Sequence, residues 1–151
     1  MGLREEFVDF CKEHGTLKFE RNIAQCYIKP DTVLDNLAEF REDLEELLKL
    51  QIEDLLVTVA PEDDDIRINF YKFAPGKDRW GAASIEIHER AENIVISTDY
   101  KDIWIRGQKG DNSGCVVEVD GDGELRASCL YITPEEAHDT RISSVTALVK
   151  L

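Results

Sequence analysis

The spacing of apolar residues changes at residue 55, and this change limits the folds open to the chain. From Leu55 onward apolar and polar residues alternate in short runs, as expected of strands with one buried face. Segments rich in Gly, Asp, Asn and Pro separate the runs and predict turns. The predicted strands cover residues 55–59, 66–73, 83–90, 94–98, 103–106, 115–119 and 124–132. Because short loops join consecutive strands, we expect an antiparallel meander.

The segment ahead of this point predicts a helix followed by strands. Residues 3–14 place their apolar side chains on one stripe of a helix, and Gly15 is expected to end that helix. Residues 17–28 alternate with a period of two instead, which favours a strand. A turn at Arg21 and Asn22 is expected to break this strand.

A second helix is predicted to begin at Thr32. Thr32 and Asp35 form a variant capping box, in which side chains satisfy the free N–H groups of the first turn. Apolar residues then follow at helical spacing: Val33, Leu37, Phe40, Leu44, Leu47, Leu48, Ile52 and Leu55. Such a stripe suits a short coiled-coil seam and equally a helix that lies across a sheet.

The C-terminal segment permits two interpretations. Thr133, Pro134 and Glu136 resemble an N-cap, a proline at the first helical position and a capping-box glutamate. The alternation of β-branched and small residues toward Leu151 suits a strand as well. We predict a helix in residues 134–151, because the start signal has a physical mechanism.

These elements predict one α+β domain that spans residues 1–151. Its expected architecture is an antiparallel sheet of about six to eight strands with two or three helices packed on one face. The 151 residues are 42% hydrophobic and 33% charged, which is the composition of a globular protein. No run of about 18 apolar residues occurs, and acidic residues near Met1 do not resemble a secretory signal. We therefore expect a cytoplasmic protein.

The cysteines show no metal-binding spacing. The chain holds Cys11, Cys26, Cys115 and Cys129. In a reducing compartment we expect reduced thiols that behave as small buried side chains. A three-residue turn in the last predicted hairpin would place Cys115 opposite Cys129, whereas a two- or four-residue turn would place Cys115 opposite Ser128. We expect the thiols of this pair to be free.

Residues 118–125 admit a metal-site interpretation and a hairpin interpretation. Carboxylates occupy the first, third and fifth positions and glycine the sixth, as in a calcium-binding loop. Cys129 stands where such a loop needs a bidentate glutamate, and the flanking residues favour strands. We therefore predict a β-hairpin and no metal site.

No catalytic signature is present in the sequence. His14, His88 and His138 lack the neighbouring residues of known catalytic motifs, and no nucleophile motif occurs. The glycine-bearing residues 107–114 are expected to join two strands, so they lack the strand-to-helix context of a phosphate loop. These observations favour a protein that is not an enzyme and needs no cofactor.

The negative charge is concentrated between residues 31 and 65. The net charge of the chain is −14, and this stretch holds thirteen acidic residues against Arg41 and Lys49. Such a field repels phosphates and anionic membranes, so direct binding of nucleic acid or a membrane is not expected. The same field attracts a basic protein and accelerates its association.

Three functions are consistent with these features. The first is an acidic inhibitor, of the immunity or anti-defence type, that blocks a basic surface of a partner. Its predicted partner-binding residues are Asp35, Glu39, Glu42, Asp43, Glu45, Glu46, Asp63 and Asp64. The second is a ligand-binding domain or modest enzyme with a pocket between sheet and helices. Its predicted pocket residues are Tyr71, Arg79, Trp80, Trp104 and Arg106. The third is a structural module that dimerises through the second helix or an open sheet edge.

Overall fold

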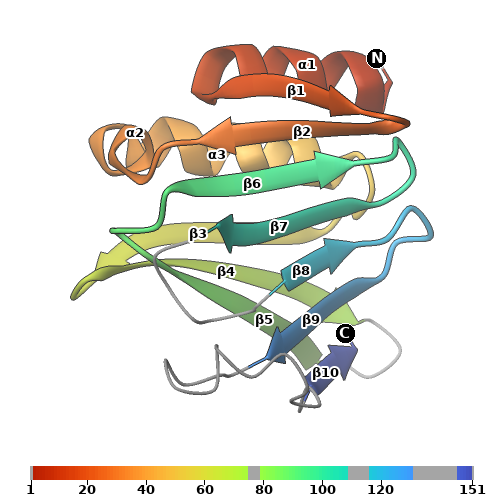
Figure 1. The fold of residues 1–151 in the computed structure, drawn as a ribbon. Helices are drawn as coiled ribbons and strands as arrows, with labels where there is room; N and C mark the ends of the chain where they lie inside the picture. Colours follow the sequence, from red (N-terminus) through yellow and green to blue (C-terminus); the bar gives the residue numbers. More distant parts are fainter. Residues whose placement is uncertain (1, 75–78, 109–115, 131–145, 151) are drawn as a thin grey trace, which may run out of the picture.

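The computed structural model describes residues 2–74, 79–108, 116–130 and 146–150. This part of the chain forms three helices and ten strands in two antiparallel sheets (Figure 1). The helices are α1 (Leu3–His14), α2 (Pro30–Asp35) and α3 (Leu37–Lys49). The seven-stranded sheet has the order β1 (Thr16–Glu20), β2 (Ile23–Ile28), β6 (Asn93–Thr98), β7 (Ile103–Gln108), β8 (Val116–Val119), β9 (Leu125–Leu130), β10 (Thr146–Lys150). The three-stranded sheet has the order β3 (Leu55–Glu62), β4 (Asp65–Ala74), β5 (Arg79–His88).

The predicted α+β class and antiparallel pairing are confirmed. The helices and the small sheet lie behind the large sheet in Figure 1, so one side of the large sheet is covered by both. Alternate residues of β4 (Ile66, Ile68 and Phe70) are fully buried, as are Ile103 and Ile105 of β7. These side chains belong to one continuous core between the layers. Neighbouring strands are consecutive in the chain except at β2 and β6, which pair with each other. Residues 55–88, which lie between these two strands in the chain, form the small sheet instead of extending the meander.

The N-terminal predictions hold closely. Helix α1 covers the predicted residues, and a turn with Arg21 at φ 57° separates β1 from β2. Gly15 ends α1 with φ −162°, so it does not adopt the left-handed conformation expected of a helix-ending glycine. A side chain is excluded there for another reason, because a Cβ atom at Gly15 would collide with the carbonyl oxygen of Tyr27.

The prediction of one continuous second helix is wrong. The chain forms two helices that meet at Asn36, which has φ −141° and ψ 50°. Pro30 starts α2 ahead of the predicted cap, so Thr32 lies inside the helix. Asn36 has low helix propensity and leaves the helical conformation readily. Helix α3 then packs on α1 and β3, so its apolar stripe faces the core and not a coiled-coil partner.

The predicted C-terminal helix is wrong for residues 146–150. These residues form β10, which pairs antiparallel with β9 and satisfies its otherwise unpaired backbone edge. The predicted start of that helix at Thr133 lies outside the described residues. None of the described helices combines the length and the apolar character that crossing a membrane requires.

The prediction of reduced thiols is wrong for one pair. Cys11 of α1 and Cys26 of β2 are joined by a disulfide, with their Cα atoms 5.5 Å apart and both side chains fully buried. The two residues lie 15 positions apart in different elements and share no motif, so the packing of α1 on β2 brings them together. Strands β8 and β9 pair Val116 with Ser128, which is the register of the three-residue turn. Cys115 itself lies outside the described residues.

Candidate functional site

Helices α1 and α3 each present a row of carboxylates on one side. Glu6, Asp9 and Glu13 follow one another at spacings of three and four residues along α1. Glu39, Asp43 and Glu46 do the same along α3. Residues at these spacings share one face of a helix, so each helix carries a continuous acidic row.

The two rows face each other across a groove, which we call the acidic groove. It has a volume of about 360 Å³. Its lining residues are Glu6, Asp9, Phe10, Glu13, Glu39, Asp43, Glu46 and Leu47. Phe10 and Leu47 are 6% and 2% exposed, so the bottom of the groove is apolar and its walls carry six carboxylates.

A buried histidine fixes one wall of the acidic groove. The Nε2 atom of His14 lies 2.6 Å from Oδ2 of Asp43, and the histidine is only 6% exposed. The imidazole ring also contacts Phe10, at 4.8 Å between ring centroids, and Phe40, at 5.6 Å. This contact joins α1 to α3 beside the groove.

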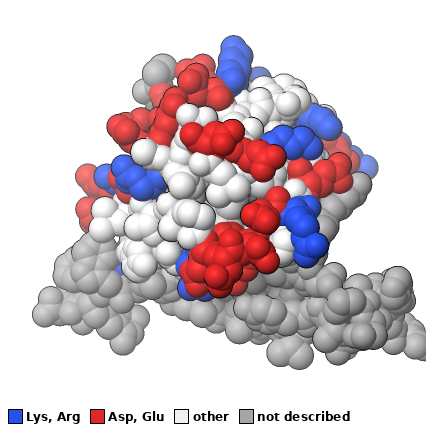
Figure 2. All heavy atoms as spheres, turned by 90° about the vertical axis from the view of Figure 1, so that its left-hand side faces the viewer, with Lys and Arg blue, Asp and Glu red and all other residues white. Residues whose placement is uncertain are grey.

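Only part of the predicted acidic surface contributes to this groove. Glu39, Asp43 and Glu46 line it, whereas the Glu45 carboxylate turns to β3 and accepts a hydrogen bond from the Val57 amide at 2.9 Å. Glu45 also pairs with Arg41 at 3.3 Å and Lys49 at 3.7 Å. The remaining predicted residues are exposed but do not line the groove: Asp35, Glu42, Asp63 and Asp64. Figure 2 likewise shows acidic groups interrupted by uncharged surface and by basic side chains.

The acidic row on α1 was missed from the sequence. Residues 1–30 hold equal numbers of acidic and basic residues, so their net charge gave no signal. The signal lay in the spacing of Glu6, Asp9 and Glu13, which puts the acids on one face of the predicted helix. Charge summed over a segment conceals this separation.

The residues of the alternative pocket are not brought together. Trp104 and Arg106 alternate with the buried Ile103 and Ile105, so they lie on the outer side of the large sheet. Tyr71 follows the buried Phe70, so it lies on the outer side of the small sheet. These outer sides point in opposite directions because the two sheets meet through their buried sides. The side chains of Arg79 and Trp80 lie outside the described residues.

The turn between β6 and β7 is held by Asp99. Its Oδ1 atom accepts hydrogen bonds from the amides of Lys101, at 2.9 Å, and Asp102, at 2.8 Å. Burial acts to raise the pKa of Asp99, but these amides and the Lys101 ammonium outweigh it and lower the pKa below its usual range. The turn thereby fixes the backbone from which Asp102 projects.

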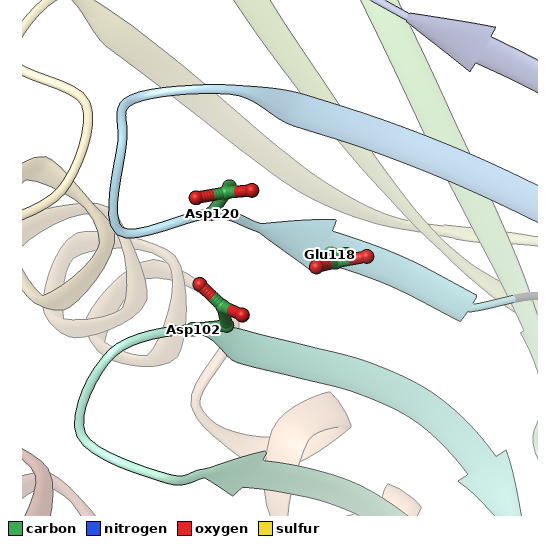
Figure 3. Close-up of side chains that lie close together, drawn as sticks. All are labelled: Asp102, Glu118 and Asp120. Atoms are coloured by element: carbon green, nitrogen blue, oxygen red, sulfur yellow. The ribbon is translucent and has the colours of Figure 1, made fainter.

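A carboxylate cluster forms beside this turn. Asp102, Glu118 and Asp120 place one oxygen each within 4.8 Å of one another (Figure 3). Asp102 accepts a hydrogen bond from the Gly121 amide at 2.9 Å, and Asp120 accepts one from the Asp122 amide at 2.7 Å. Ca²⁺ takes six to eight oxygen ligands, so three carboxylates, two of which already accept hydrogen bonds from backbone amides, supply an incomplete set. The predicted hairpin is confirmed at this position, but Asp102 comes from another loop and was missed from the sequence.

No protein-family model matches the chain, and searches of curated proteins and of solved structures give no match. Function must therefore be inferred from the geometry and charge of the acidic groove.

Proposed function

We propose that the chain is a non-enzymatic acidic binding protein, of the inhibitor, immunity or anti-defence type, that blocks a basic surface of a partner protein. One observation carries this proposal. Six carboxylates from α1 and α3 line a single groove whose lining holds no lysine or arginine, and among the described residues only Asp43 of the six contacts a basic side chain, that of His14.

The electrostatics of the groove favour a cationic occupant. Like charges placed side by side on two packed helices repel one another, and this repulsion is relieved when lysine or arginine side chains enter between them. Carboxylates accept charge-assisted hydrogen bonds, which are shorter and stronger than bonds between neutral groups. A guanidinium group can bind two carboxylate oxygens at once. The groove therefore suits an arginine-rich or lysine-rich surface.

The dimensions of the groove define the size of the segment that it accepts. Glu6 and Glu13 are seven helical residues apart, so each acidic row is about 10 Å long at 1.5 Å per residue. Two turns of a helix or three residues of an extended strand cover this length. The apolar bottom at Phe10 and Leu47 accommodates the aliphatic stems of the entering side chains.

The test begins with capture from a native extract of the host at low salt, followed by elution in a salt gradient. A recovered basic protein is then purified, and its association rate is measured against two matched variants. The groove variant carries Asp9→Lys, Glu39→Lys and Glu46→Lys. The control variant carries Asp35→Lys, Glu53→Lys and Asp64→Lys, which change the net charge equally at exposed positions outside the groove.

We expect the groove variant to lower the association rate at least about ten-fold and the control variant to lower it only about two- to three-fold. Equal losses in the two variants would show that the overall field, and not the groove, attracts the partner. Recovery of no basic protein, or an association rate that is unchanged in the groove variant, would contradict the proposal.

A further inference from the structure

A second hollow lies on the other side of the last turn of α1. Its volume is about 470 Å³, and three lysines from three different elements line it. Lys12 comes from the last turn of α1, Lys18 from β1, and Lys29 from the N-cap of α2. We call this hollow the lysine pocket. Figure 2 views the side of the molecule on which α2 lies, and it shows basic side chains among the acidic ones.

We propose that the lysine pocket binds a small anion through a phosphate group. Three lysines line the pocket, and Thr16 and Thr32, which also line it, carry hydroxyl groups that can act as neutral hydrogen-bond donors. Lysine binds phosphate as a point charge without demanding a fixed bidentate geometry. The volume lies within the range of small-molecule sites.

The ammonium groups are available to a ligand. In the part of the chain that the structure describes, neither Lys12 nor Lys18 forms an ion pair, although the protein holds 32 acidic residues. The Lys18 ammonium lies over the Tyr27 ring, 4.5 Å from its centroid. Lys29 donates to the Glu92 carbonyl oxygen at 3.3 Å, and this acceptor carries no charge. By contrast, Lys49 and Arg41 of α3 both pair with the Glu45 carboxylate.

Gly15 allows the elements that line the pocket to come close together. Because glycine has no side chain, the end of α1 approaches the backbone of β2 at Tyr27 more closely than any other residue would allow. This approach brings the last turn of α1 beside the start of β1 and the end of β2. The lysines of these elements therefore line one hollow.

The surrounding charge restricts the ligand to a small anion. Glu13 and Glu92 also line the pocket, so the three lysines leave an excess of about one positive charge. A long polyanion would extend beyond the pocket into the field of a chain with net charge −14, which repels it. A single phosphate group, by contrast, is small enough to stay inside a pocket of about 470 Å³.

The test is a titration with inorganic phosphate at constant ionic strength and neutral pH, followed by the amide resonances of Thr16, Lys18 and Lys29. We expect saturable shifts confined to the pocket. The variant Lys12→Gln/Lys18→Gln should lower the affinity for phosphate at least about ten-fold. The control Lys49→Gln/Lys101→Gln removes the same charge at exposed positions outside the pocket and should change the affinity less than about two-fold.

Matched titrations with acetate and sulfate define the ligand class. Weaker binding of both anions than of phosphate supports a phosphate site. Equal binding of acetate, the absence of saturable shifts with phosphate, or equal losses in the two variants would overturn the proposal. All substituted lysines are exposed, so the variants should retain the fold, and unchanged circular dichroism verifies this.

Discussion

The acidic groove and the lysine pocket lie on either side of the last turn of α1 and share Glu13 as a lining residue. The groove carries six carboxylates and no basic residue, whereas the pocket carries three lysines. Lys12 and Glu13 are neighbours in the sequence, but successive residues of a helix point about 100° apart. The helical periodicity therefore places acidic and basic residues of one charge-balanced segment on two surfaces, of which one favours cations and the other anions.

The same contacts of α1 hold both hollows in place. His14 lines the lysine pocket and holds Asp43, which lines the acidic groove. The Cys11–Cys26 disulfide attaches α1 to β2 close to both hollows. Displacement of α1 should therefore affect both sites, whereas changes of surface charge should separate them.

The largest expected effect comes from the disulfide. It joins residues 15 positions apart, and closing a loop of this size stabilises a folded protein by about 3 kcal/mol. Reduction of the wild-type protein should lower its free energy of unfolding by about this amount and weaken binding in both hollows. Urea denaturation with and without a thiol reductant measures the change.

The variant Cys11→Ala/Cys26→Ala is the control for this experiment, because its stability should not respond to the reductant. Equal stability of oxidised and reduced wild-type protein would show that the disulfide does not hold α1. Loss of binding in only one hollow on reduction would contradict the claim that the disulfide holds α1 in place for both hollows.

A smaller change at Glu13 should act on the two hollows with opposite sign. Glu13→Gln removes one negative charge from the groove and one from the pocket. We expect the affinity for a basic partner to fall about two-fold and the affinity for phosphate to rise about two-fold. Isothermal titration of one preparation with each ligand measures both values. If both affinities rose or both fell, Glu13 would act by stabilising the structure and not by its charge.

The smallest expected effect lies at Asp99, which lines neither hollow. Its lowered pKa stabilises the fold above the ordinary aspartate pKa of about 3.9, and this contribution disappears as the pH falls through the lower pKa of the folded state. Asp99→Asn keeps an oxygen acceptor but loses the charge. The wild-type protein should therefore be slightly more stable than this variant at neutral pH and not in strong acid. A difference that persists unchanged in strong acid would contradict this account.

The sequence predicted the elements whose signals are local. Helix α1 and the alternating strands follow from short-range spacing, and the hairpin at residues 118–125 follows from its turn residues. The break at Asn36 could not be predicted in the same way, because the apolar stripe continues through it. The strand at residues 146–150 depends on the free edge of β9, which only the folded sheet provides.

The candidate sites were less predictable because they depend on contacts between distant segments. Glu39, Asp43 and Glu46 were identified from their charge, but the opposing row on α1 comes from a segment with no net charge. The pairing of Cys11 with Cys26 needs the packing of α1 on β2. The sequence therefore predicted the acidic face of α3 but not that of α1, and only the packing of the two helices shows that these faces meet.

The most direct test of the central claim is a pair of amide-resonance titrations on one labelled sample, with a short arginine peptide and with inorganic phosphate. We predict that the peptide shifts Asp9, Glu39 and Glu46 in the acidic groove, while phosphate shifts Thr16 and Lys18 in the lysine pocket. Peptide-induced shifts spread evenly over residues 31–65, or the same shifts with both ligands, would contradict the claim that two separate hollows of opposite charge preference flank α1.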